Sequence, residues 1–218
     1  MSNKNITIAI DGTAASGKGT LARSLSKEFN FAYLDTGKLY RASALIISKK
    51  NIHYENIKDI KKIIGSFDFS TFNFFDDMLK SDEIGKLASM ISGYKELRNI
   101  LLEYQKTFSY KRHDNKVGVI LDGRDIGTVV LPEADIKFFI TASLSERAER
   151  RWKELILLGQ STIKRNVEKD IRDRDERDSK RTHSPLVAAS DAILLDTTNL
   201  DANESFLLAK EYVEERLK

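Results

Sequence analysis

The sequence predicts an α/β fold in which helices flank a parallel sheet of five short strands. Three observations support this prediction. Short apolar segments alternate with longer amphipathic ones along the chain, as they do in folds with a parallel sheet. A glycine-bearing loop with a lysine joins the first apolar segment to the first amphipathic one. No internal repeat or low-complexity linker interrupts the alternation.

Five apolar segments have the length and composition of buried strands. They are residues 6–10, 31–34, 117–121, 136–140 and 192–195. Strands that are buried on both faces have nearly continuous apolar sequences, whereas strands with one wet face alternate. These segments are of the continuous kind, which favours a parallel sheet covered on both sides.

Helical periodicity is expected in the segments between the strands and after the last one. They are residues 18–29, 37–48, 83–91, 95–112, the highly charged region 145–181, and 203–217. In the first of them, Leu21, Leu25 and Phe29 lie on one helical face. Residues 50–82 have the least regular pattern. Within them, residues 67–74 alternate in the manner of a strand, so we expect a small hairpin or an edge strand there.

The composition is that of a single ordinary domain. With 218 residues the chain can bury a substantial core, and its net charge of +3 does not indicate a nucleic-acid partner. The absence of cysteine excludes disulfides and thiolate metal sites. No signal segment and no run near the roughly 18 apolar residues of a membrane span is found, so we expect a cytoplasmic protein without a membrane partner. A monomer is the default expectation.

The three histidines of the chain give no sign of a metal site. They are His53, His113 and His183, and their spacing is not that of metal ligands. We therefore predict no metal site built from protein ligands alone. Trp152 is expected to be a packing anchor rather than a platform on which a base stacks.

The strongest functional signal is a phosphate-binding loop between the first strand and the first helix. It consists of Gly12, Thr13, Ala14, Ala15, Ser16, Gly17, Lys18, Gly19 and Thr20. Glycines let main-chain amides turn toward a phosphate, the helix N-terminus adds its positive end, and Lys18 adds a point charge. The loop predicts ATP binding with Mg²⁺ as cofactor, and its register with strand and helix argues against a chance glycine-rich turn.

The loop departs from the usual pattern at one position. A serine or threonine that ligates Mg²⁺ normally follows the lysine, but here Gly19 follows it and Thr20 comes next. We therefore expect phosphates and water to hold most of the metal's coordination sphere.

Charged residues follow the strand 117–121. Asp122, Arg124 and Asp125 come at its carboxyl end, and in an open parallel sheet ligands bind at the carboxyl ends of strands. An arginine can orient an acceptor phosphate, while carboxylates can steer metal-bound water or the edge of a base. The alternative is a structural turn held together by an arginine–aspartate pair.

The charged region ends in an arginine-rich segment. Arg174, Arg177 and Arg181 are spaced i, i+3 and i+7, which predicts one shared helical face. Converging guanidiniums stabilise the charge of a phosphoryl-transfer transition state. Five acids and five bases share residues 170–181, so a solvated helix of salt bridges is the alternative. The interleaved acids argue against nucleic-acid binding, which favours a surface of one sign.

Four motifs together resemble the bacterial cytidylate kinase family of nucleoside monophosphate kinases. They are residues 12–20, 34–41, 122–130, and 174–181 followed by Ser184-Pro185-Leu186. The first indicates only a P-loop protein, whereas the second and third are specific to the family. The resemblance covers nearly the whole chain. It implies the P-loop kinase fold with strand order 2-3-1-4-5, and a single domain 1–218 with a monophosphate-binding region at about 36–112 and a lid at about 152–182.

The resemblance also implies an activity and its residues. ATP, bound at the loop 12–20, would phosphorylate CMP and dCMP, with a catalytic set that comprises Lys18, Arg124, Arg174 and Arg181. The residues implied to bind CMP are Thr36, Tyr40, Arg41, Ser89, Arg98, Asp122, Arg124, Asp125, Asp178 and Arg181. Of these, Arg41 would contact the acceptor phosphate. The spacing of Thr36 and Tyr40, four apart at a helix start, independently puts both on one side.

Thr13 stands where the family commonly has proline, which should alter the stiffness of the loop and little else. Residues 65–85 are short and lack the family's glycine-rich stretch with an Ile-Arg pair, so the selectivity for CMP stays open. A P-loop kinase for another acceptor, such as UMP, AMP or a small metabolite like shikimate, is therefore the first alternative. The second is a nucleotide- or RNA-binding module without turnover.

Overall fold

The structure of the protein is a computed structural model that describes residues 6–217. The chain divides into two compact units. The first comprises the described residues up to Leu34 and those from Ser109 onward, and the second is Asp35–Phe108.

Five strands form one sheet in the order β2-β3-β1-β4-β5. Their bounds are β1 Ile6–Gly12, β2 Ala32–Asp35, β3 Gly118–Asp122, β4 Ile136–Thr141 and β5 Ile193–Asp196. The sheet is parallel: β1 pairs in parallel with β3 and β4, and β4 with β5. The predicted strands, their parallel pairing and their order are thus confirmed. Ile10 is in register with Asp122, and Gly12 with Ile140, so the carboxyl ends of the three central strands lie together.

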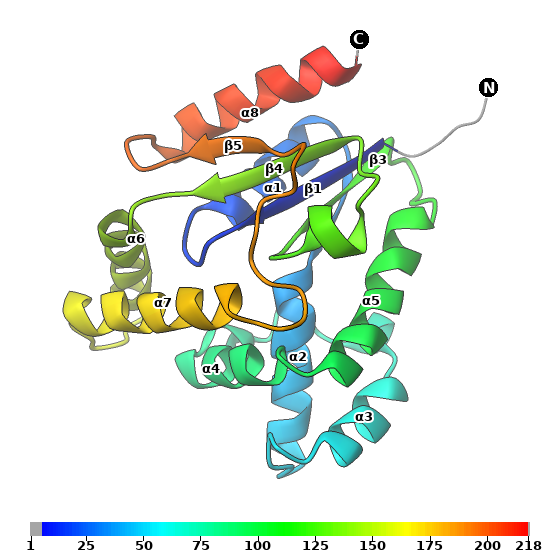
Figure 1. Cartoon of the computed structure of the whole chain (residues 1–218), viewed down its shortest axis with the longest axis vertical. Coiled ribbons are helices and arrows are strands. Elements are labelled where there is room, and N and C mark those ends of the chain that lie inside the picture. The colour runs from blue at the N-terminus through cyan, green and yellow to red at the C-terminus, as the bar shows by residue number, and fades with distance from the viewer. Residues whose placement is uncertain (1–5, 218) are drawn as a thin grey trace. The chain divides into compact units, whose positions relative to one another are not determined.

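One face of the sheet is covered by α1 and α8 (Figure 1). Alternate residues of β1, such as Ile8 and Ile10, bury their side chains in the core on this face. Leu25 of α1 and Val213 of α8 belong to the same fully buried cluster. This packing holds the start of α1 at the end of β1, where the phosphate loop lies.

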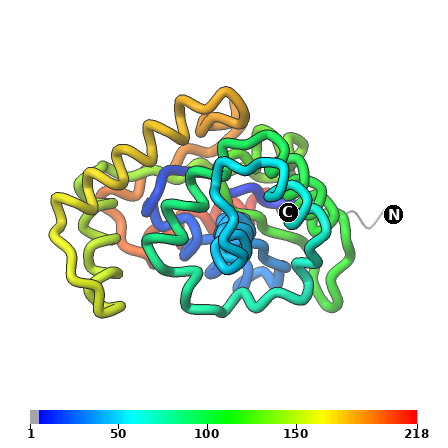
Figure 2. The backbone as a smooth tube through the Cα atoms, turned by 90° about the horizontal axis from the view of Figure 1, so that it is seen from below, coloured from blue at the N-terminus to red at the C-terminus, as the bar shows by residue number. Residues whose placement is uncertain are grey.

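Eight α-helices accompany the strands in the described part of the chain. They are α1 Lys18–Glu28, α2 Thr36–Lys49, α3 Ile57–Gly65, α4 Asp82–Ile91, α5 Lys95–Tyr110, α6 Leu144–Leu157, α7 Lys164–Ser179 and α8 Ala202–Leu217. The charged region predicted as helical over 145–181 is two helices rather than one, since residues 158–163 turn the chain between α6 and α7. These two helices lie side by side in both Figure 1 and Figure 2.

In the second unit, α2 is the most buried helix of those described, with residues such as Leu39 and Ile47 fully enclosed. Figure 2 shows it end-on, with the chain of this unit passing around it. The helix α3 was not predicted. Asn56 caps it by accepting from the amide of Asp59, and Ile60 and Ile64 bury its inner face.

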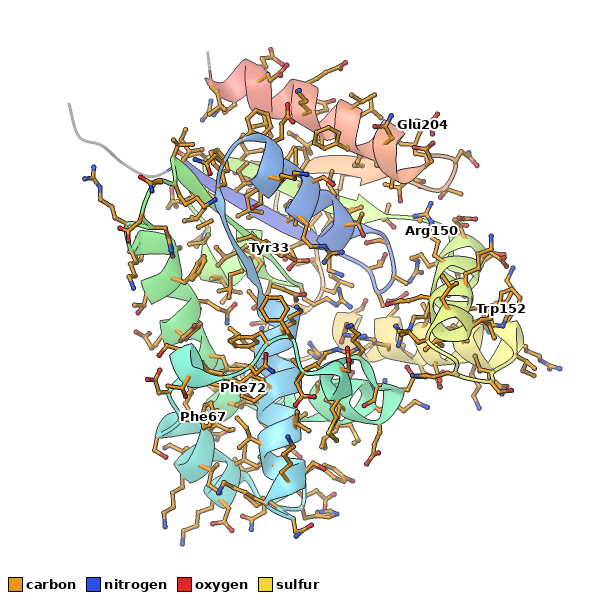
Figure 3. All side chains as sticks on the ribbon, turned by 180° about the vertical axis from the view of Figure 1, so that it is seen from behind. Tyr33, Phe67, Phe72, Arg150, Trp152 and Glu204 are labelled. Carbon is orange, nitrogen blue, oxygen red and sulfur yellow. The ribbon has the colours of Figure 1, made fainter. Side chains whose placement is uncertain are left out.

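The strand predicted at residues 67–74 is wrong. The chain there forms the 3₁₀ turn η1 Phe69–Thr71, which the carboxylate of Asp68 caps. A second 3₁₀ turn, η2 Asp77–Lys80, follows these residues and is capped by Asp76. The alternating phenylalanines pack edge-on in a cluster instead of lining a sheet. Phe67 contacts Phe72 with ring centroids 6.0 Å apart (Figure 3). Carboxylates that accept hydrogen bonds from nearby main-chain amides favour turns over a strand at this point.

No helix within residues 6–217 has the length and apolar character that a membrane crossing requires.

Candidate functional site

The phosphate loop runs from the end of β1 into α1. Gly12 has φ 153°, and a Cβ there would lie 2.0 Å from the carbonyl oxygen of Ile140 on β4, so only glycine fits. The amide of Thr13 donates to the same oxygen at 3.2 Å. Gly17, with φ 87°, precedes the first turn of α1. The Nζ of Lys18 lies 3.3 Å from the carbonyl oxygen of Thr13, across the mouth of the loop. The loop therefore has the strand, turn and helix geometry that a phosphate site needs.

The geometry around Gly19 explains the unusual residue after the lysine. Asp122, the last residue of β3, is buried, and its Oδ1 accepts from the hydroxyl of Tyr33 at 3.2 Å. Its Oδ2 lies 3.2 Å from where a Cβ on Gly19 would stand. A serine or threonine in this position would crowd the carboxylate. The structure thus brings Asp122 next to the phosphate loop, as the carboxyl-end argument expected.

A buried carboxylate anchors the segment that follows β3. Asp11 accepts from the amides of Ile126 at 2.8 Å and Gly127 at 2.7 Å, within the wide helical turn η3 Ile126–Val130. Burial raises the pKa of Asp11 to about 6, although the two amides act in the opposite direction. Sequence reasoning missed this residue. Its position, an acid inside an apolar strand directly before the glycine loop, was the available signal.

Asp178 is the centre of a cluster of guanidiniums. It accepts from Arg124 Nε at 2.8 Å, and Arg181 and Arg174 lie 2.5 Å and 3.8 Å from its carboxylate. Arg124 also donates to the carbonyl oxygen of Gly12 at 2.7 Å, which ties the cluster to the phosphate loop. Burial alone raises the pKa of Asp178, but the charges of Arg124, Arg181 and Arg174 outweigh it, so the net shift is downward.

The cluster differs from the predicted arginine stripe. The helix α7 ends at Ser179, so Arg181 lies beyond it, and Arg177 is exposed. The prediction that Arg174, Arg177 and Arg181 share one helical face is therefore wrong. Arg174 and Arg181 are gathered by Asp178 instead, and the third guanidinium comes from Arg124 after β3. The alternative of surface salt bridges does describe part of α7, where Lys180 pairs with Glu176 and Arg172 with Glu168.

A second buried arginine joins α6, α7 and the loop. Arg147 on α6 donates to Ala142 O at 2.8 Å and Ala14 O at 3.2 Å, and it lies 2.5 Å from Asp175 on α7. Asp175 in turn accepts from the amide of Ala14 at 3.4 Å. A loop residue is thus held through both its amide and its carbonyl. Sequence reasoning missed these contacts because their partners are far apart along the chain.

A cavity of about 780 Å³ opens beside the phosphate loop. Its walls are the loop and the start of α1, part of α6, and residues 197–202 after β5. Arg150 on α6 fixes this last segment, since it donates to Thr197 Oγ1, Thr197 O and Leu200 O at 3.0, 2.6 and 3.2 Å (Figure 3). This wall of the cavity could have been predicted from the polar residues that follow β5, because ligands bind at the carboxyl ends of parallel strands.

Trp152 is a packing residue, as predicted. It packs against the buried cluster between α6 and α7, and its Nε1 donates to Thr162 O at 3.0 Å (Figure 3). Within the described residues, no group of three or more His, Cys, Asp or Glu is placed to hold a metal ion.

The second unit carries some of the residues that the resemblance assigns to the acceptor. Thr36 and Tyr40 lie on α2, Ser89 on α4 and Arg98 on α5, and all but Tyr40 are buried. The guanidinium of Arg98 lies 5.6 Å from the ring centroid of Tyr40, and its Nη1 donates to Ser92 O at 3.1 Å. The helices α2 and α5 therefore bring Tyr40 and Arg98 together within the unit.

Comparison with known proteins gives a consistent result. The family model described as cytidylate kinase matches residues 8–214. A protein of Rhodospirillum rubrum named cytidylate kinase is 44% identical over 202 residues, which cover 93% of this chain and 94% of that protein. Another of this name, from Bartonella tribocorum, is 40% identical and covers 99% of this chain and 97% of its own.

A solved structure is similar in fold alone. An uncharacterized protein from Eubacterium ventriosum superposes with a TM-score of 0.54 at 12% identity, covering 97% of this chain and 99% of that one. The family model spans nearly the whole sequence, and both relatives exceed one third identity over more than nine tenths of the chain. The chain belongs to the cytidylate kinase family.

Proposed function

We propose that the protein transfers the γ-phosphoryl group of ATP to CMP and dCMP, forming CDP and dCDP in pyrimidine nucleotide metabolism. Family membership supports the reaction, and the guanidinium cluster that joins Asp178 to the phosphate loop is the observation that carries it. A nucleotide-binding module without turnover has no use for cations gathered beside its phosphate loop. The proposed location is the cytoplasm, where these nucleotides are metabolised.

On the donor side, the loop 12–20 would hold the phosphates of ATP through main-chain amides and Lys18. The adjacent cavity of about 780 Å³ is large enough for the nucleoside. Arg150 supports this assignment because it fixes the segment 197–202 that forms the far wall.

Mg²⁺ would accompany ATP. Asp122 is the residue proposed to hold it, through bound water, because its carboxylate lies beside Gly19 at the start of α1. A single carboxylate suits an ion whose other ligands are phosphates and water. When bound, the metal supplies charge neutralisation at the phosphates.

The proposed acceptor residues lie on both units. On the second unit they are Thr36, Tyr40, Arg41, Ser89 and Arg98, with Arg41 on the phosphate. On the first unit they are Asp122, Arg124, Asp125, Asp178 and Arg181. Cytosine offers one amine donor with ring nitrogen and carbonyl acceptors, which a set of serine, arginine and aspartate can match. A monophosphate is already an anionic nucleophile, so no general base is assigned.

Catalysis would consist of positioning and electrostatic stabilisation, with Lys18, Arg124, Arg174 and Arg181 around the transferred group. We propose that residues 152–182 act as a lid and residues 36–112 as the monophosphate-binding region of a single domain. Closure of the lid excludes water and so suppresses hydrolysis of ATP. We propose that the enzyme is a monomer.

A coupled assay of ADP release tests the proposal. CMP, dCMP, UMP, AMP, GMP and shikimate are each offered with Mg-ATP, and we expect turnover chiefly with CMP and dCMP. Lys18→Ala should reduce turnover by at least about 100-fold, because the ammonium group that neutralises charge on the transferring phosphate is lost. The control is Lys27→Ala, which removes an exposed lysine of the same helix. A preference for AMP or GMP, or normal turnover in Lys18→Ala, would contradict the proposal.

A further inference from the structure

The guanidinium of Arg41 has a defined position within the second unit. Arg41 lies on α2, and its Nη1 donates to Leu79 O at 2.6 Å and Ser81 O at 3.2 Å. These two carbonyls stand where η2 ends and α4 begins. Both bonds are charge-assisted, so they fix the direction of the side chain more firmly than neutral bonds do.

The position of Arg41 depends on a glycine. A Cβ on Gly85, in the first part of α4, would lie 2.8 Å from Arg41 Nη2, 3.0 Å from Nη1 and 3.1 Å from Cζ. Non-bonded carbon and nitrogen atoms do not approach so closely. The guanidinium therefore occupies the space beside the main chain of α4 that any side chain at position 85 would fill. Glycine is a poor helix former, so helix stability does not explain its presence here.

We propose that Gly85 is a positioning residue for the acceptor phosphate and acts through Arg41. This inference rests on the proposed function, in which Arg41 contacts that phosphate. The glycine and the carbonyls of Leu79 and Ser81 together form a seat for the guanidinium. Its planar fork of five N–H donors can hold an anion in two-point geometry only when its plane and direction are set.

Alanine at position 85 should displace the arginine and leave the helix in place. The atoms in conflict are the far end of a long flexible side chain, whereas the neighbouring Ile84 and Ala88 of α4 are buried in the unit. The guanidinium of Arg41 should therefore move, and the main chain of α4 should not. Alanine also favours the helix more than glycine does. If the glycine had only a structural role, its replacement by alanine would lower the stability and weaken the binding of ATP and CMP equally.

The seat can be tested with a pair of matched variants. Gly85→Ala should raise the KM for CMP by about tenfold or more, because misplacing one charged donor weakens phosphate binding by that factor, and change the KM for ATP by less than about twofold. Its thermal midpoint should equal or exceed that of the wild type. The control is Gly65→Ala at the end of α3, where a Cβ would meet only Ile100 Cδ1 at an ordinary 3.7 Å. This control should leave both KM values unchanged.

Coupling to Arg41 is tested by a double variant. Gly85→Ala combined with Arg41→Ala should be no worse for CMP than Arg41→Ala alone, since the glycine acts only through the arginine. Additive losses would overturn the inference, as would a Gly85→Ala enzyme that behaves like Gly65→Ala. Equal rises in both KM values with a lower thermal midpoint would indicate a structural role and overturn it as well.

A spectroscopic readout separates this inference from the proposed function. The Nε–H signal of Arg41 in ¹⁵N-labelled protein, assigned by its loss in Arg41→Ala, should shift in Gly85→Ala and not in Gly65→Ala. If the wild type phosphorylates no monophosphate, the proposed function fails and the signal still reports the seat. An unshifted signal in Gly85→Ala overturns the seat whatever the acceptor is.

Discussion

Arg124 Nε lies 2.8 Å from Asp178 Oδ2, in a pair that is almost completely enclosed. The two residues are 54 positions apart, so the pair joins the segment after β3 to the end of α7. Arg174 and Arg181 share the same carboxylate. One negative charge thus holds three guanidiniums, whose mutual repulsion it offsets. The arrangement keeps cations close together beside the phosphate loop.

Asp178→Asn should therefore damage both stability and activity. Without the buried carboxylate, the guanidiniums of Arg124, Arg181 and Arg174 repel one another with no charge to offset them. We therefore expect the free energy of unfolding to fall by about 3 kcal/mol and turnover to fall by more than about tenfold. Urea denaturation and the ADP-release assay measure the two effects. Glu176→Gln is the control, since it removes an exposed acid of the same helix that pairs with Lys180. A variant as stable and active as this control would contradict the role given to Asp178.

The titration of Asp11 should make stability depend on pH between about 4 and 6. Its pKa rises from 3.8 to about 6 on folding, so the folded state binds the proton more tightly than the unfolded state. Stability from this group is therefore full at low pH and is lost as the pH rises through 6, by at most about 3 kcal/mol. The unfolding free energy of the wild type minus that of Asp11→Asn should therefore fall by up to that amount from pH 4 to pH 7.

Stability is the suitable measurement for Asp11 because phosphate groups of the substrates also titrate near pH 6. Asp35→Asn provides the control in the same urea series, since Asp35 is a half-buried carboxylate that caps α2 through the amide of Lys38. If the difference in unfolding free energy between the wild type and Asp11→Asn did not depend on pH, the pKa of Asp11 would not be raised on folding.

Most of the fold could be predicted because its signals are local. Each strand is a short apolar run and each long helix has a repeating apolar face, so periodicity sufficed for both. Periodicity gave the wrong secondary structure for residues 67–74. Their phenylalanines alternate because they fill an aromatic cluster, and the carboxylate of Asp68 caps a turn of the chain between them. The Asn56 cap and the isoleucine spacing of α3 were present in the sequence and were overlooked.

The candidate site was predictable only where its residues follow one another in the chain. The phosphate loop and the segment after β3 are continuous motifs, and the structure brings both to the same edge of the sheet. Asp11 and the contacts of Arg147 with Asp175 depend on partners more than 25 residues away. No spacing rule connects such residues, because tertiary packing alone brings them together.

Arg147→Lys tests the connection between α7 and the phosphate loop. Lysine keeps the charge and loses the fork that reaches Ala142, Ala14 and Asp175 together, so main-chain oxygens lose donors. We expect a loss of about 2 kcal/mol in stability and a larger rise in the KM for ATP than in the KM for CMP. The control is Arg172→Lys, an exposed position on α7. Equal changes in the two KM values would contradict a role centred on the loop.

Gly19→Ser, which restores the usual residue after the lysine, should impair the enzyme rather than improve it. The new Cβ would stand 3.2 Å from Asp122 Oδ2, and this carboxylate is buried and held by the hydroxyl of Tyr33, so it can yield only slightly. Displacing the proposed magnesium-steering group should raise the Mg²⁺ concentration needed for half-maximal rate by about tenfold, as expected for one disturbed charged contact. Tyr33→Phe in the same protein frees the carboxylate and should restore part of the loss, which a simple steric defect in the loop would not allow. Titration of the rate with Mg²⁺ at fixed ATP, with Gly65→Ser as the control, decides between these outcomes. A Gly19→Ser enzyme with unchanged magnesium dependence would mean that Asp122 does not act on the metal.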